Sequence, residues 1–92
     1  MEFEIYEDGG YTLIEISHNS KSLGEYVLPS GVAGEDFFSQ YLNDIKIEFF
    51  DVLGVSEWWI TDREGIVIEG AFYDIEEAKK AWRNLVMTHH EV

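Results

Sequence analysis

The sequence contains no cysteine and one proline, and its 92 residues include only six basic side chains against 19 acidic ones. Without cysteine, the chain can form neither a disulfide framework nor a thiolate metal site, and it has no thiol nucleophile. No apolar run approaches the ~18 residues that a membrane span requires. The formal charge of −13 disfavours nucleic acid and anionic lipid as direct ligands. We therefore expect a cytoplasmic protein that contacts neither membranes nor nucleic acid directly.

Apolar residues in the first half follow the period of two that is typical of β-strands. Phe3 and Ile5 alternate with acidic residues, and Asp8-Gly9-Gly10 is a hairpin-turn sequence. Two further strands are predicted, from about 13 to 17 and from about 23 to 28. A short helix, from about Val32 to Asn43, follows the only proline.

The stretch from Ile45 to Leu53 fits two structures. On a helical wheel its apolar residues continue the preceding helix, which would then run from about Glu35 to Leu53. As a strand, the same stretch alternates, and its β-branched and aromatic content favours this second structure. The second half then continues with the turn sequence at 62–65 and with a helix that Asp74 caps.

Sliding the chain by 44 residues supports the strand, because apolar positions and turns of the two halves then coincide. Residues 1–43 and 45–87 therefore form a hypothetical pseudo-repeat within one domain, residues 1–92. The predicted fold is α+β, an antiparallel sheet in two βββα halves with six strands and two helices on one face. The alternative has five strands, one long helix and one short helix.

Strand alternation divides the side chains between two faces of the predicted sheet. The inward set is Phe3, Ile5, Ile14, Ile16, Ile47, Phe49, Trp58, Ile60, Ile66, Ile68 and Phe72. The outward set contains seven glutamates, namely Glu2, Glu4, Glu15, Glu25, Glu48, Glu57 and Glu69. Lys46 is the only basic residue on that outer face, which also carries Leu13, Tyr6, Phe50 and Trp59.

Two interpretations of this acidic face stay open at this point. It is either ordinary solvated surface or a surface for a basic partner, on which carboxylates steer association and aromatic rings provide contact area. Glutamate is depleted in strands, and like charges on neighbouring strands repel, so solubility alone is an inefficient explanation. The predicted binding residues are Glu2, Glu4, Glu15, Glu25, Glu48, Glu57, Glu69, Phe50, Trp59 and Tyr6.

In size and charge the chain resembles phage-encoded inhibitors of bacterial defence nucleases and bacterial nuclease-immunity proteins. This is a resemblance of type, and it transfers no residues. It implies a small inhibitor that occupies the basic nucleic-acid-binding groove of another protein, as a DNA mimic would. The alternative is an assembly domain that self-associates. No motif predicts an enzyme, a cofactor or a metal site, and the oligomeric state is open.

Overall fold

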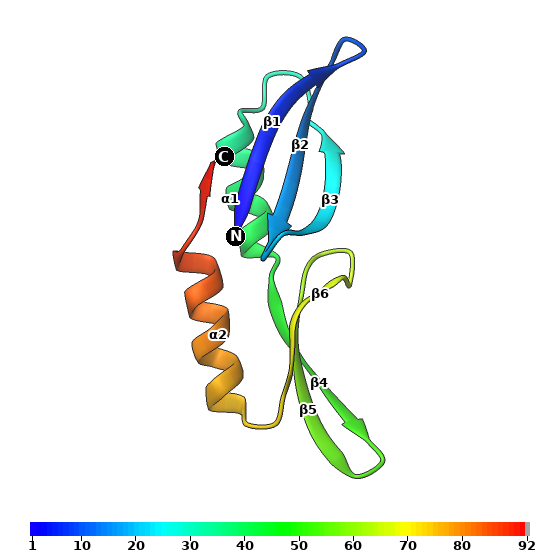
Figure 1. Ribbon diagram of the computed structural model, residues 1–92, viewed down its shortest axis with the longest axis vertical. Helices are drawn as coiled ribbons and strands as arrows, with labels where there is room; N and C mark the ends of the chain where they lie inside the picture. The colour runs from blue at the N-terminus through cyan, green and yellow to red at the C-terminus, as the bar shows by residue number, and fades with distance from the viewer. Residues whose placement is uncertain (92) are drawn as a thin grey trace.

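The computed structural model describes residues 1–91 and shows an α+β fold (Figure 1). The elements of the first half are β1 (Glu2–Asp8), β2 (Tyr11–His18), β3 (Lys21–Val27) and α1 (Gly34–Asn43). Those of the second half are β4 (Lys46–Val52), β5 (Val55–Thr61), β6 (Val67–Phe72) and α2 (Ile75–Met87). A two-residue strand, β7 (His90–Glu91), pairs in parallel with β1.

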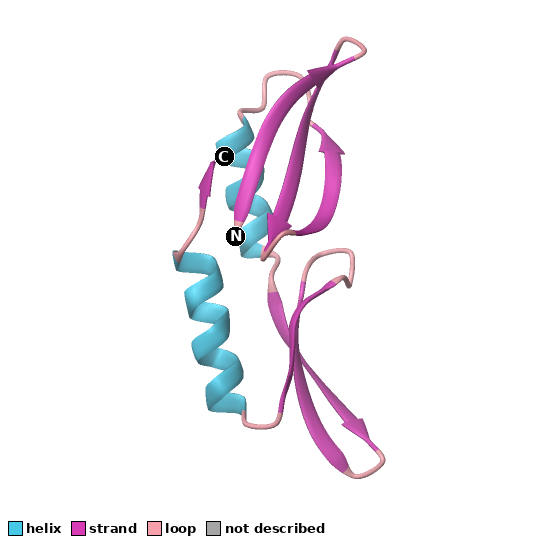
Figure 2. Cartoon of the chain, viewed as in Figure 1, coloured by secondary structure: helices cyan, strands magenta, loops and turns pink. Residues whose placement is uncertain are grey.

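The six predicted strands form two antiparallel sheets. The first sheet has the order β3-β2-β1, with β7 at its edge, and the second has the order β4-β5-β6. Each sheet is covered on one face by its own helix, α1 on the first and α2 on the second (Figure 2). The predicted α+β fold is thus confirmed. The alternative with one long helix is wrong, because α1 ends at Asn43 and residues 46–52 pair with β5.

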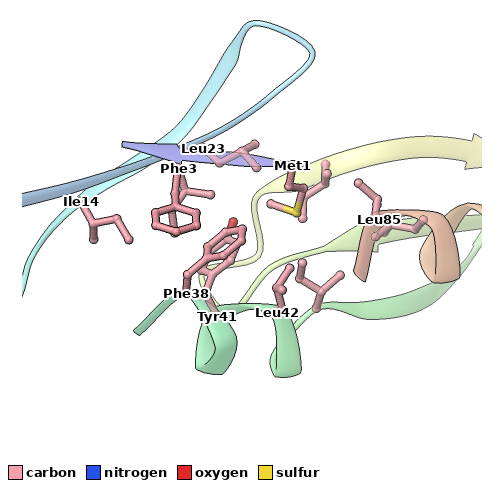
Figure 3. Packing of buried hydrophobic residues seen from close by; sticks show 12 residues of the cluster. Met1, Phe3, Ile14, Leu23, Phe38, Tyr41, Leu42 and Leu85 are labelled. Carbon is pink, nitrogen blue, oxygen red and sulfur yellow. The ribbon is translucent and has the colours of Figure 1, made fainter. Parts of the chain in front are cut away.

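A single cluster of buried side chains joins the two halves (Figure 3). Phe38 of α1 lies on Phe3 of β1, with ring centroids 4.5 Å apart. Leu85 of α2 belongs to the same cluster, and the indole of Trp82 donates a hydrogen bond to the carbonyl of Ile45, at 2.9 Å. The long axis of the molecule is 50 Å, against 23 and 22 Å for the other two.

Phe49 lies opposite Trp58 on the predicted inner face, but the residue is 56% exposed, so the prediction that it packs in the core is wrong. Phe49 pairs with Trp58, which in turn pairs with Phe72 at the last residue of β6. The β4–β5 hairpin extends beyond the end of β6 and beyond the first turn of α2 (Figure 1). No helix therefore covers the outer part of this hairpin. Strand alternation gives the side of a residue but not how far along the sheet the covering helix reaches.

A buried aspartate links the halves through hydrogen bonds that the sequence pattern did not reveal. Asp62 is 0% exposed and accepts a hydrogen bond from the hydroxyl of Tyr41, at 2.7 Å. Its other carboxylate oxygen accepts from the backbone amides of Glu64 and Ile66, each at 2.9 Å. The guanidinium of Arg63 covers the Tyr41 ring at 5.6 Å from the centroid. Asp62 therefore fastens the turn between β5 and β6 to α1.

This arrangement predicts a loss of stability in alkaline solution. Burial raises the pKa of the Tyr41 hydroxyl well above its usual value of 10.0, and the hydrogen bond to Asp62 acts in the same direction. The unfolded chain then releases this proton at lower pH than the folded chain. Above pH ~10 the free energy of unfolding should therefore fall, by roughly 1.4 kcal/mol per pH unit for this one group.

Urea unfolding between pH 8 and pH 12, followed by circular dichroism, measures this fall. Tyr41→Phe should be less stable than wild type at pH 8 but should lose stability less steeply above pH ~10. Deprotonation of lysines affects both proteins equally. Parallel pH profiles for the two proteins would contradict the assignment.

Candidate functional site

Three glutamates lie directly opposite one another across the outer face of the first sheet. Glu4 of β1 pairs with Glu15 of β2, and Glu15 pairs with Glu25 of β3. We refer to these three residues as the acidic row. Directly opposite side chains have their Cβ atoms about 4.5–5.5 Å apart. Glu4 and Glu25 are exposed, and Glu15 on the central strand is half-buried.

No ion pair compensates the charge of the acidic row in the part of the chain that the structure describes. None of the ion pairs found there includes Glu4, Glu15 or Glu25. Like charges in this position oppose strand pairing by roughly 0.2–1 kcal/mol per pair. The sheet tolerates this cost because its inner face buries Phe3, Ile14 and Ile16. The result is a concentration of negative charge that folding does not require.

An apolar row borders the acidic row. Tyr6, Leu13 and Val27 pair with one another across the same three strands, two residues further along β1. Two residues of a strand span about 6.8 Å. Val27 is 55% exposed, while Tyr6 and Leu13 are half-buried. The outer face of the first sheet thus combines carboxylates with apolar contact area, and Glu2 lies on the same face opposite Ser17.

The outer face of the second sheet repeats this combination in another arrangement. Glu48 pairs with Trp59, and Phe50 pairs with Glu57, so acidic and aromatic side chains alternate across β4 and β5. The indole of Trp59 donates a hydrogen bond to Glu57, at 3.1 Å, and Lys46 forms an ion pair with Glu48, at 2.9 Å. Four of the predicted binding residues therefore lie together on this face.

Glu69 was predicted to share that outer face, and this placement is wrong. The register between β5 and β6 shifts twice, so that Glu69 lies directly opposite Ile60, which faces the core. Bulges of this kind interrupt the period of two on which the prediction depended. The carboxylate of Glu69 lies 2.7 Å from the ring of His18, and both residues line a hollow beside Leu85 of α2. The predicted binding residues are therefore divided among three places.

The tip of the β4–β5 hairpin is an exposed apolar surface that sequence reasoning missed. Leu53 is 99% exposed, and Val52 and Val55 are 46% and 50% exposed. The two-residue loop Leu53-Gly54 has positive φ at both positions, 52° and 82°. Such loops usually contain Asn, Asp or Gly. The unusual leucine in this turn could have indicated the exposed tip, but only after the position of the turn was known.

The described residues contain neither a metal-binding cluster nor a membrane-spanning helix. No group of three or more histidine, aspartate or glutamate side chains is placed there to hold a metal ion. The helices of that part of the chain are too short and too polar to span a bilayer.

Known proteins add no information about the role of these surfaces. No protein-family model, no curated protein and no solved structure matches the chain. The functional proposal therefore depends on the geometry and charge of the surface itself.

Proposed function

We propose that this protein is a small acidic inhibitor that occupies the basic nucleic-acid-binding groove of another protein. The observation that carries the proposal is the acidic row, in which Glu4, Glu15 and Glu25 face one another across three strands. Proteins of the phage anti-defence and nuclease-immunity types would use such a surface. The partner would be a basic protein of the same cell.

Charge density supports this role. Neighbouring strands lie about 4.8 Å apart, so the carboxylates of the acidic row are somewhat more widely spaced than the phosphates of one DNA strand, which carries one charge per about 3.4 Å of axis. Duplex DNA carries one charge per about 1.7 Å of its axis, and the lysines and arginines of a DNA-binding groove are arranged to neutralise such a row. Carboxylates on a rigid sheet can steer this groove onto the protein before close contact forms.

The neighbouring apolar row supports a protein partner rather than a small ion. Aromatic and apolar side chains at the centre of an interface contribute most of its affinity, whereas exposed charges contribute orientation and association rate. Tyr6, Leu13 and Val27 lie beside the carboxylates on the same sheet face. A groove that receives the acidic row would therefore also cover these side chains.

Affinity capture with elution by DNA tests the proposal. The protein is immobilised, and a bacterial fraction enriched on immobilised duplex DNA is applied at low salt. We expect a protein from this fraction to be retained and then released by excess duplex DNA at the same ionic strength, because both ligands would occupy one groove. Retention that duplex DNA does not reverse would contradict the proposal.

The exposed hairpin tip favours the second candidate function, an assembly domain that self-associates. In the single chain, the apolar surface formed by Leu53, Val52 and Val55 is exposed to solvent. Exposed apolar patches frequently mark protein interfaces. Sedimentation over a range of concentrations distinguishes this function, which predicts an oligomer in wild type and a monomer in Leu53→Ser.

A further inference from the structure

A hollow of about 320 Å³ lies on the outer face of the second sheet, apart from the acidic row. Its lining comprises the carboxylate-bearing residues Glu48 and Glu57, the aromatic residues Phe50 and Trp59, and Val52, Thr61, Gly65 and Val67. The volume is at the lower end of the range for ligand sites, which suits one side chain rather than a whole cofactor.

The hydroxyl of Thr61 is the polar group in this lining that lacks a partner. Thr61 is only 2% exposed, and among the described residues its Oγ1 atom has no hydrogen-bond partner. A buried hydroxyl without a partner destabilises a fold, so such groups are rare in native proteins. Thr61 lies between Lys46 and Val67 in the register of the sheet, on the same face as Glu57 and Trp59. A ligand that enters the hollow and satisfies this hydroxyl would remove the penalty.

The lining selects for a planar cation. Carboxylates accept two parallel hydrogen bonds from a guanidinium, and a guanidinium also stacks on tryptophan and phenylalanine rings. Its five N–H donors leave one for a threonine oxygen. An ammonium group is a compact point charge that lacks this fork and this planar surface. We propose that the hollow binds an arginine side chain presented by a partner protein.

The contacts that now occupy the two carboxylates can be exchanged. The ion pair between Lys46 and Glu48 is exposed, with 59% and 31% of the respective side chains accessible. Exposed pairs of this kind contribute little to stability. Glu57 accepts a single hydrogen bond from the indole of Trp59, which leaves its other oxygen available for a guanidinium. The two carboxylates can therefore accept an arginine without a change in the fold.

An arginine-binding hollow would serve any partner that presents this side chain at its surface. The proposal therefore goes beyond the nucleic-acid groove of the preceding section. A negative result here would leave the role of the acidic row unaffected, and a failure of DNA elution would leave the hollow unaffected.

Peptide titration followed by NMR tests the proposal on the full chain. The probes are the blocked tripeptide Gly-Arg-Gly and its counterparts with citrulline or lysine in the middle. We expect the arginine peptide to shift the Trp59 indole N–H and the Thr61 amide resonances in a saturable manner. Citrulline has the same shape without the charge, so its peptide should bind at least ~10-fold more weakly. Equal binding of the citrulline or lysine peptide would overturn the assignment.

Two conservative variants test the lining. Thr61→Val keeps the shape but removes the hydroxyl, so it should raise Tm by a few degrees and weaken arginine binding at least ~3-fold. Glu57→Gln should weaken it to a similar degree, because the charge is lost while the side chain stays. Glu35→Gln, on α1 and outside the hollow, is the matched control and should bind as wild type does.

The variants also define what would refute the site. Unchanged arginine binding in Thr61→Val would show that the hydroxyl is not a ligand. A lower Tm in that variant would show that the hydroxyl already has a partner within the fold. A loss of binding in Glu35→Gln equal to that in Glu57→Gln would show that net charge, rather than the hollow, attracts the peptide. Each result would overturn the proposal.

Discussion

Replacement of Asp62 by alanine is expected to lower the free energy of unfolding by about 3–5 kcal/mol. The substitution removes the acceptor of three hydrogen bonds, one from the Tyr41 hydroxyl and two from backbone amides. Each donor left unsatisfied in a buried site costs about 1–3 kcal/mol. Domains of this size have a total stability of roughly 5–15 kcal/mol, so the loss is a large part of it. Urea denaturation followed by tryptophan fluorescence measures the change.

Asp62→Asn is the matched control for this prediction. The amide oxygen of asparagine can still accept hydrogen bonds from the turn amides, and the Tyr41 hydroxyl can rotate to accept one from the new amide group. The loss should therefore be about 1–2 kcal/mol, since most of the hydrogen bonds are retained. A loss below about 1 kcal/mol for Asp62→Ala would show that the turn is not fastened through this carboxylate.

Residue patterns could predict the number and order of the elements because these depend on local sequence. The alternation around Phe3 and Ile5 and the cap at Asp74 act over a few residues, and both appear in the structure. The stretch from Ile45 to Leu53 was ambiguous because its apolar spacing satisfies both periods. The structure shows that this stretch is a strand, because β4 pairs with β5 in a regular register that places Glu48 opposite Trp59.

Features that depend on contacts between distant residues could not be predicted in this way. Tyr41 and Asp62 are 21 residues apart, and nothing in either local sequence indicates their hydrogen bond. The bulge between Val67 and Glu69 turned Glu69 toward α2, because one extra residue reverses the face of those that follow it, and a second bulge lies between Glu69 and Phe72. The exposed side chain of Phe49 likewise depends on where α2 begins.

The candidate site was predictable to the extent that its strands are regular. In β1, β2 and β3 the outward positions Glu4, Glu15 and Glu25 follow from alternation alone. Their direct opposition does not, since it requires the register of two strand pairs. With that register, the three glutamates form a row of facing carboxylates instead of being scattered over the sheet. Whether this row binds a partner stays a prediction.

Reversal of the acidic row should have the largest effect on binding of a partner identified by DNA-elution capture. Each glutamate-to-lysine change adds two charge units, so replacement of Glu4, Glu15 and Glu25 changes the formal charge from −13 to −7. Three attractive contacts with a basic groove then become repulsive, and such like-charge contacts cost several kcal/mol. We expect the affinity to fall at least ~100-fold, and most of this change should be in the association rate.

Folding should survive this reversal. Lysines facing one another repel as glutamates do, so the strand pairing of the variant should be about as stable as that of wild type. The inner face that buries Phe3, Ile14 and Ile16 is unchanged. Circular dichroism and thermal unfolding would establish that any loss of binding is not a loss of structure.

The matched control carries the same net charge. Lysine in place of Glu35, Glu76 and Glu77 also gives −7, but these exposed residues lie in the first turns of α1 and α2. The control should lose some stability, because acidic residues favour helix N-termini by about 0.3–1 kcal/mol each. Its association rate should fall much less than that of the row variant. Equal losses in the two variants would indicate attraction by total charge, not by the row.

Ionic strength separates steering by the acidic row from close contact. Exposed charges are screened beyond about 8 Å at physiological salt, so the association rate of wild type should fall steeply as salt is added. The variant with the reversed row should respond weakly or in the opposite direction, since added salt screens its repulsion from the groove. Dissociation should change little with salt in either protein, because it depends mainly on close contacts such as those of Tyr6 and Val27. Surface plasmon resonance at several salt concentrations measures both rates. If wild type and the row variant show the same salt dependence, Glu4, Glu15 and Glu25 are solvated surface charges and the partner binds elsewhere.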